Sequence, residues 1–92
     1  MSYEIVHTTQ FRKDYKLMRK RGKDKQKLEE VLRILAAGGQ LPPEKRDHAL
    51  AGEYTGFREC HIEPDWLLIY CYLHKQLILV CSRTGTHSDL FE

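Results

Sequence analysis

The sequence predicts a small α+β domain in which a helical hairpin covers one face of an antiparallel sheet. Two observations predict this class. Residues 8–39 carry apolar side chains at helical spacing, and residues 56–83 carry three apolar runs of strand length separated by turn residues. The chain has 92 residues, 41% hydrophobic and 30% charged, which is typical of one globular domain spanning residues 1–92 and excludes a disordered tail.

The N-terminal part is expected to form a strand and a helix. Tyr3–His7 alternates polar and apolar residues, which is typical of a short strand. Thr8 or Thr9 can cap the helix that follows, and Gly22 ends it. The apolar residues of this helix fall on one face, at i, i+4 and i+7: Phe11, Tyr15 and Met18.

A second helix is expected to follow at once. Asp24 can cap it, and Gly38-Gly39 ends it. Its apolar residues share one face: Leu28, Val31, Leu32 and Leu35. Because about three residues join the two helices, we expect an antiparallel hairpin. Pro42-Pro43 forbids a longer helix, and residues 40–54 are expected to be mostly loop.

The C-terminal part is expected to form an antiparallel β-meander. Its strands are Gly56–Ile62, Asp65–Leu73 and Gln76–Arg83, joined by turns at Glu63-Pro64 and His74-Lys75. With the helices packed on one side, the other face of the sheet is expected to be uncovered. A polymeric substrate could lie there.

The net charge of +2 conceals an uneven distribution of charge. Residues 1–47 carry 12 Lys and Arg against 7 Asp and Glu, whereas residues 48–92 carry 3 against 6. Nine basic residues lie between Arg12 and Lys27. They could solvate the outer faces of helices, or they could bind a polyanion such as RNA. The basic residues that we expect to contact RNA are Lys13, Lys16, Lys20 and Lys23.

Several classes of protein are excluded. The longest apolar run, residues 66–73, is far shorter than the roughly 20 residues that span a bilayer, and no signal peptide opens the chain, so a cytoplasmic protein is expected. Cys60, Cys71 and Cys81 have neither zinc spacing nor an even number, and we interpret them as reduced structural residues.

Five polar residues are candidates for catalysis. They are His48 in the loop, His61 and Asp65 on either side of the Pro64 turn, Arg83 at the end of the last strand, and His87 in the tail. His61 and Asp65 are expected to be neighbours across the ladder. Taken singly, each has a structural explanation: a solvated loop histidine, a buried histidine, a turn residue or a surface ion pair.

Two aromatic residues are candidates for contact with bases. Trp66 could stack on a base or belong to the core. Phe91 lies four residues after His87, so a single helical turn would place both on one face. Phe91 could instead pack against the core and fix the C-terminus.

Together, these residues point to cleavage of a phosphodiester. Histidine can accept or donate a proton near pH 7, and arginine can bind the charge that develops on phosphate oxygens. The sequence contains no carboxylate cluster of the kind that binds Mg²⁺, so no metal or other cofactor is expected. Metal-free cleavage needs an internal nucleophile, and RNA supplies one in its 2′-OH. RNA is therefore favoured over DNA.

Three segments carry a family resemblance. They contain the motifs DHxLxG at residues 47–52, HxEPDW at 61–66 and RTGTHxxLF at 83–91. In this order they resemble the YafQ toxins, members of the RelE/ParE superfamily of bacterial type II toxin–antitoxin systems. The resemblance covers nearly the whole chain and implies a RelE-like fold.

The resemblance implies an mRNA interferase, a ribosome-dependent endoribonuclease that cuts message in the A site of the 30S subunit, with a preference for adenine-rich, lysine-type codons. It also implies a DinJ-like antitoxin as partner. The family's functional positions fall on His48, His61, Asp65, Trp66, Arg83, His87 and Phe91.

In the mechanism that we expect, the substrate 2′-OH attacks the adjacent phosphorus and leaves a 2′,3′-cyclic phosphate. His87 would be the general acid, His61 or Asp65 the base with His48 assisting, and Arg83 the group that stabilises charge. The alternative is a noncatalytic ParE-like inhibitor of DNA gyrase on the same fold, for which the histidines would be dispensable. A third possibility is a stand-alone RNA-binding module.

Overall fold

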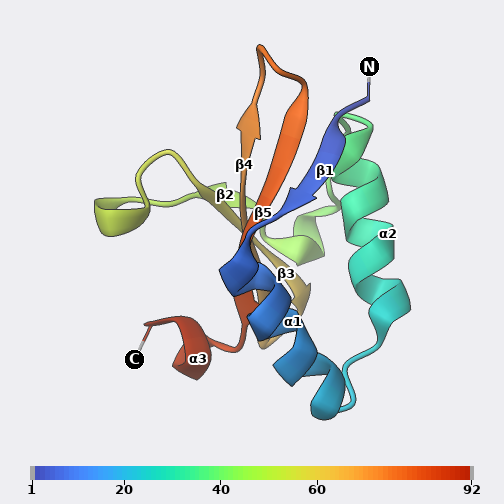
Figure 1. The fold of residues 1–92 in the computed structure, drawn as a ribbon, viewed down its shortest axis with the longest axis vertical. Coiled ribbons are helices and arrows are strands. Elements are labelled where there is room, and N and C mark those ends of the chain that lie inside the picture. Colours follow the sequence, from blue (N-terminus) through green and yellow to red (C-terminus); the bar gives the residue numbers. More distant parts are fainter. Residues whose placement is uncertain (1, 92) are drawn as a thin grey trace.

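A computed structural model describes residues 2–91, and its elements confirm the α+β class (Figure 1). In chain order the elements are β1 (Glu4–His7), α1 (Thr9–Lys20), α2 (Lys25–Ala36), η1 (Pro43–Lys45), β2 (His48–Ala49), η2 (Gly52–Tyr54), β3 (Arg58–Glu63), β4 (Trp66–Leu73), β5 (Ile78–Gly85) and α3 (His87–Phe91). The three strands of the expected meander begin and end within two residues of their expected bounds.

The strands form one mixed sheet in the order β1-β5-β4-β3-β2. Strands β3, β4 and β5 are antiparallel neighbours, as expected, and β1 pairs parallel to β5 at one edge. The opposite edge is β2, which pairs with β3. The sequence predicted a loop for this segment, because a strand of two residues leaves no alternating pattern.

Helices α1 and α2 run in opposite directions, as the hairpin prediction requires (Figure 1). Each begins at the expected kind of cap: the Thr8 Oγ1 accepts a hydrogen bond from the Phe11 amide at 2.9 Å, and the Asp24 Oδ1 accepts one from the Gln26 amide at 2.9 Å. The two helices cover one face of the sheet and bury most of the core there. No helix within residues 2–91 is long and apolar enough to cross a membrane.

Trp66 belongs to this core and has no exposed surface. Its indole Nε1 donates a hydrogen bond to the Thr84 Oγ1 at 2.9 Å, and the Thr84 hydroxyl donates in turn to the Leu67 carbonyl at 2.7 Å. The first residue of β4 therefore points under the helices, and its ring cannot stack on RNA in this arrangement. Trp66 was expected to contact an RNA base, but in the structure it is part of the hydrophobic core.

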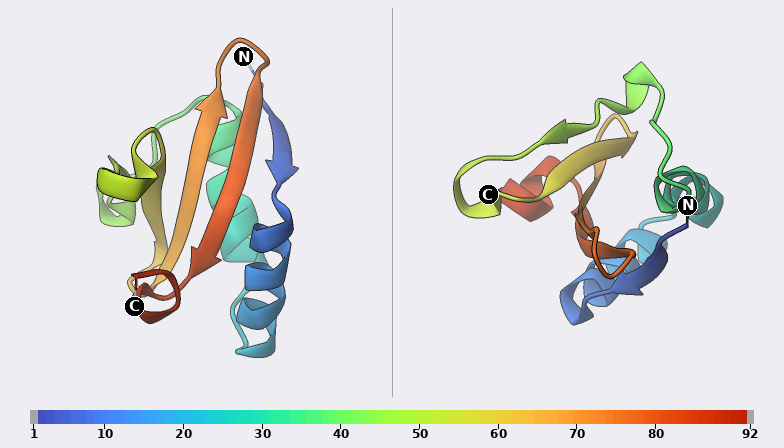
Figure 2. Two further views of the ribbon diagram at one scale, coloured as in Figure 1. Left: turned by 60° about the vertical axis from the view of Figure 1, so that its left-hand side comes forward. Right: turned by 90° about the horizontal axis from the view of Figure 1, so that it is seen from above.

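The opposite face of the sheet is not uncovered, contrary to expectation. Helix α3 and the segment of residues 50–57 fold across part of it, on the side of the sheet away from α2 (Figure 2). A second apolar cluster fills this contact: Leu67, Ile69 and Leu90, with Leu50, Tyr54 and Phe57 against them. The cover is partial, and His48 and His87 remain exposed.

The cysteines are free thiols, in agreement with the interpretation from the sequence. Cys60 and Cys81 are buried in the core, and burial raises the pKa of the Cys81 thiol to about 12. A thiol with such a pKa is protonated at neutral pH and is a poor nucleophile.

We predict that Thr84→Val lowers the free energy of unfolding by about 1–3 kcal/mol, because it leaves the Trp66 N–H and the Leu67 carbonyl without their partner. Chemical denaturation measures this loss. In a Trp66→Phe background no buried N–H remains to be paired, so the same Thr84 substitution should cost less. Equal costs in the two backgrounds would show that the hydrogen bond contributes nothing.

Candidate active site

Two of the predicted site residues, His48 and Arg83, lie in one row across the sheet with Glu59. In the ladder, His48 on β2 pairs with Glu59 on β3, Glu59 pairs with Ile69 on β4, and Ile69 pairs with Arg83 on β5. Residues directly opposite one another in a sheet share a face, and neighbouring strands lie about 4.8 Å apart. The register therefore places His48, Glu59 and Arg83 on the face that α3 partly covers.

A second row supplies the other two histidines. His61 pairs with Leu67, and Leu67 pairs with Gly85, after which the chain turns into α3. Gly85 lets the helix approach, since a Cβ there would lie 2.9 Å from the Cβ of Asp89. His87, the first residue of α3, thus returns over His61, and their ring centroids are 5.7 Å apart.

Asp65 fixes the orientation of His87. Its Oδ1 accepts hydrogen bonds from the His87 amide at 3.0 Å and from the His87 Nδ1 at 2.9 Å. These bonds lower the pKa of Asp65, first the backbone donor and then the side chain. Because the carboxylate can only accept, Nδ1 carries a proton, and Nε2 is the nitrogen left to exchange a proton with a ligand.

The position of Asp65 corrects an expectation. Asp65 was expected to face His61 across the ladder, but β3 bulges between His61 and Glu63, and Glu63 pairs with Trp66. Asp65 therefore lies in the turn before β4, and its carboxylate binds His87 instead. This arrangement suits an orienting residue better than a general base.

His61 is held in one tautomer. Its Nδ1 lies 3.0 Å from the Pro64 carbonyl, which can only accept, so Nδ1 donates. In the neutral ring Nε2 is then the basic nitrogen. This atom lies 3.9 Å from the Glu59 Oε1, and the His61 side chain is only 9% exposed.

Glu59, which the sequence did not single out, joins His48 to His61. Its side chain is 6% exposed, and its Oε1 lies 3.4 Å from the His48 Nε2. His48 is fixed from the other side, because its Nδ1 donates to the Arg46 carbonyl at 2.7 Å. A signal was present in the sequence: Glu59 stands two residues before His61 on a strand, and such residues share a face.

Glu59, His61 and His87 could also hold a metal ion. Each offers one ligand atom, and these atoms lie within 4.8 Å of one another. Two imidazoles and a carboxylate are a ligand set that zinc accepts. The sequence predicted no metal site, because the three residues are brought together only by the β3–β4–α3 arrangement.

Arg83 is held by a buried carboxylate on α1. Its Nε and Nη2 donate to Asp14 at 2.7 and 3.1 Å, and Asp14 also accepts from the Thr84 amide at 3.2 Å. The bonds to Asp14 raise the pKa of Arg83, and a smaller contribution comes from Tyr54. Asp14 is only 9% exposed, and no pattern in the sequence singled it out as a site residue.

Helix α3 is anchored to α1 by a second ion pair. The Asp89 carboxylate accepts from the Thr86 amide and hydroxyl, both at 2.9 Å, and from Arg21 at 2.7 and 3.2 Å. Arg21 first, and then the Thr86 amide, lower the pKa of Asp89 to about 2. These contacts fix the turn that presents His87.

The remaining predicted residues are more dispersed. Phe91 is 46% exposed on α3, one turn from His87, with ring centroids 6.4 Å apart. Lys13, Lys16 and Lys20 surround Leu17 on the outer face of α1. Lys23 differs from them, because its Nζ lies 3.4 Å from Glu63 in an ion pair.

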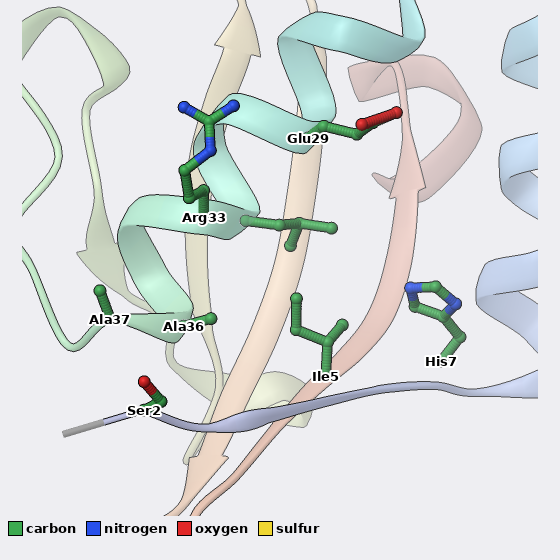
Figure 3. Close-up of a pocket in the computed structure, with 8 residues that line it drawn as sticks. Ser2, Ile5, His7, Glu29, Arg33, Ala36 and Ala37 are labelled. Atoms are coloured by element: carbon green, nitrogen blue, oxygen red, sulfur yellow. The ribbon is translucent and has the colours of Figure 1, made fainter.

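A cavity of about 630 Å³ lies apart from these residues, between β1 and α2 (Figure 3). Ile5, Leu32 and Ala36 supply its apolar lining, and His7 and Arg33 lie at it as well. Burial first, and then Arg12, lower the pKa of His7. None of the catalytic residues predicted from the sequence lines this cavity.

Comparisons with known proteins agree with the fold and with the motifs. Residues 3–92 match the family model of the bacterial toxin of type II toxin–antitoxin systems, YafQ. The mRNA interferase toxin YafQ of Escherichia coli strain K12 is 43% identical over 89 residues, which cover 96% of this chain and 95% of the relative.

Solved structures give the same result. The E. coli DinJ–YafQ toxin–antitoxin complex matches with a TM-score of 0.88 and 40% identity over all of both chains. A metal-bound toxin from Helicobacter pylori matches with a TM-score of 0.91 and 40% identity over 99% of this chain and all of that one. The fold and the site thus define a toxin of a type II toxin–antitoxin system. The chain belongs to the YafQ family.

We predict that Asp89→Asn lowers the free energy of unfolding at pH 7 by about 1 kcal/mol, mainly through the weakened cap of α3, since exposed ion pairs contribute little. The pKa of Asp89 is lowered from 3.8 to about 2, so its stabilisation is complete above about pH 5 and is lost as the pH falls towards 2. The difference between wild type and variant should therefore shrink over this interval in denaturation experiments. The exposed Glu44→Gln variant is the control, and a difference independent of pH would contradict the assignment.

Proposed function

We propose that this chain is an mRNA interferase: an endoribonuclease that cuts message in the ribosomal A site by transesterification from the substrate 2′-OH. The observation that carries the proposal is the pair His61 and His87: their ring centroids lie 5.7 Å apart, and the hydrogen bonds of each Nδ1, to Pro64 and to Asp65, leave Nε2 of each ring as the nitrogen that can exchange a proton. The curated relative is named an mRNA interferase.

The two histidines have opposite tasks. His61 Nε2 takes the proton of the 2′-OH, and the resulting oxygen attacks phosphorus. His87 donates the proton of Nε2 to the 5′-oxygen as the P–O5′ bond breaks. The products are a 2′,3′-cyclic phosphate and a 5′-OH. Asp65 keeps the protonated Nδ1 of His87 in place throughout.

Arg83 stabilises charge in this mechanism, and His48 assists the base. The Arg83 guanidinium binds the nonbridging oxygens as negative charge develops on them, while Asp14 fixes its plane. His48, on β2, lies against Glu59 of β3 and assists His61 from that side. Every step moves a proton or a bond to phosphorus, so the proposed reaction needs no metal or other cofactor.

The outer face of α1 is the proposed contact with ribosomal RNA. Its Lys13, Lys16 and Lys20 project into solvent around an exposed Leu17. Lys23 contributes less, because Glu63 neutralises it. An enzyme that acts in the 30S A site works in the cytoplasm, and we retain the preference for adenine-rich, lysine-type codons as part of the proposal.

The proposed partner outside the ribosome is a DinJ-like antitoxin. This rests on membership of the family and on the solved complex of the E. coli relative with DinJ. The rival function, inhibition of DNA gyrase in the manner of ParE, needs none of the proton-transfer geometry around His87. Its expectation is that substitution of the histidines leaves toxicity unchanged.

His87→Ala should reduce message cleavage on programmed ribosomes by about 10²–10⁴-fold, because a positioned general acid contributes this much. Primer extension on the cut message measures the rate. His74→Ala is the matched control, since His74 lies at the tip of the β4–β5 hairpin and its side chain hydrogen-bonds only Tyr3 within residues 2–91. Cleavage by His87→Ala at the wild-type rate would refute the role of the acid.

Replacing Lys13, Lys16 and Lys20 by alanine should weaken ribosome binding and reduce its dependence on salt. The slope of log K against log[salt] should fall by about 0.7–0.9 for each phosphate that the variant no longer neutralises. Filter binding at several salt concentrations measures this slope, with Lys75→Ala at the hairpin tip as control. An unchanged slope would exclude this face of α1 as an RNA contact.

Zn²⁺ should inhibit cleavage, because binding to His61 and His87 would occupy the nitrogens that transfer protons. The geometry of the cluster and the metal-bound H. pylori relative support this proposal. Chelation with EDTA should restore the rate, and Glu59→Gln should raise the Zn²⁺ concentration needed for binding, as measured by calorimetry. Equal binding by wild type and the Glu59 variant would contradict the assigned ligand set.

A further inference from the structure

Aromatic rings continue the candidate site beyond His87. The ring centroids of Phe91 and Tyr54 lie 6.0 Å apart at an interplanar angle of 77°. Those of Tyr54 and Phe57 lie 6.1 Å apart at 89°. With the contacts of His87 to His61 and to Phe91, these rings form an uninterrupted series from β3 to the segment of residues 50–57. Tyr54 has no part in the mechanism described above.

The segment that carries Tyr54 is folded tightly. The Leu50 amide donates to the Phe57 carbonyl at 2.9 Å, which closes the segment at its two ends. The Phe57 amide donates back to the Tyr54 carbonyl at 2.9 Å, and Gly56 between them adopts a φ of 95°. Side chains of this segment pack against Leu67, Ile69 and Leu90. The Tyr54 ring is thus held in one place, although it lies outside regular strands.

Tyr54 also lies near Arg83, the residue proposed to stabilise the charge on the phosphate. Its side chain contributes to the raised pKa of Arg83, after the larger contribution of Asp14. The same ring contacts Phe91, which shares α3 with His87. A nucleotide whose phosphate lies between Arg83 and His87 would therefore have Tyr54 and Phe91 within reach of a neighbouring base.

We propose that Tyr54 determines how the base beside the scissile phosphate is bound: with Phe91 it forms an aromatic corner on which this base stacks. Because the two rings are inclined at 77°, the base can stack on the face of one ring while its edge contacts the other ring. Phe91 is 46% exposed and Tyr54 is half-buried, so the corner opens to solvent. The sequence suggested Trp66 for this role, but Trp66 is enclosed in the core.

The inference rests on the proposed endoribonuclease activity and adds a residue and a ligand to it. Aromatic rings stack on any base, and preference arises from stacking strength, which favours the larger purines. Tyr54 would therefore favour a purine at the adjacent position without reading its hydrogen-bonding edge.

The test is a cycle of two enzymes and two substrates on programmed ribosomes. The enzymes are wild type and Tyr54→Leu, a variant that keeps an apolar side chain against Leu67, Ile69 and Leu90. The substrates are a message with an intact purine beside the cut site and the same message with an abasic nucleotide there. For wild type, loss of the base should reduce single-turnover cleavage by about 5- to 150-fold. For Tyr54→Leu the intact message should be cut more slowly, and loss of the base should reduce the rate by a smaller factor than in wild type, because only Phe91 still contacts the base.

Two controls isolate the contribution of the Tyr54 ring. Tyr54→Phe keeps the ring and should retain the wild-type sensitivity to the abasic site. Tyr3→Leu makes the same change at a tyrosine outside the site and should behave as wild type. The inference is overturned if Tyr54→Leu, folded by circular dichroism, keeps the full sensitivity to base loss, and equally if Tyr54→Phe loses it. If wild type cuts neither message, the proposed function fails, and Tyr54 has no base to bind.

Discussion

The register of β4 between its two neighbours is the constraint on which the site depends. Alternation along this strand places Trp66, Leu68 and Tyr70 under the helices and Leu67 and Ile69 on the other face. The same register aligns residues of β2, β3 and β5 with Leu67 and Ile69, and so brings His48, Glu59, His61 and Arg83 to one face. A shift of β4 by one residue would move each of its side chains to the opposite face of the sheet and would separate the site residues.

The helical face contributes to the chemistry from behind the sheet. Asp14 on α1 binds both the side chain of Arg83 and the backbone of Thr84, and Arg21 at the end of α1 binds Asp89 on α3. Two charged pairs thus connect α1 to the end of β5, which carries Arg83, and to α3, which carries His87. In such a small protein, the surface proposed to bind the ribosome and the frame of the active site belong to the same helix.

Local patterns in the sequence predicted most of the fold, including both helix caps, the hairpin and the three meander strands, because these depend on residues near one another in the chain. Contacts between residues far apart in the sequence were harder to predict. Asp65 was expected beside His61, whereas a bulge in β3 directs it to His87. Glu59, Asp14 and Tyr54 went unnoticed, since each acquires its partner only when strands, α1 and the segment of residues 50–57 pack together.

The central claim is that His87 protonates the departing 5′-oxygen. It is tested most directly with a message in which sulfur replaces this oxygen at the cut site, because a thiolate leaves without protonation. His87→Ala should cut the normal message at least about 100-fold more slowly than wild type, yet cut the sulfur-containing message at nearly the wild-type rate. An equal deficit on both messages would contradict the account and assign His87 another role.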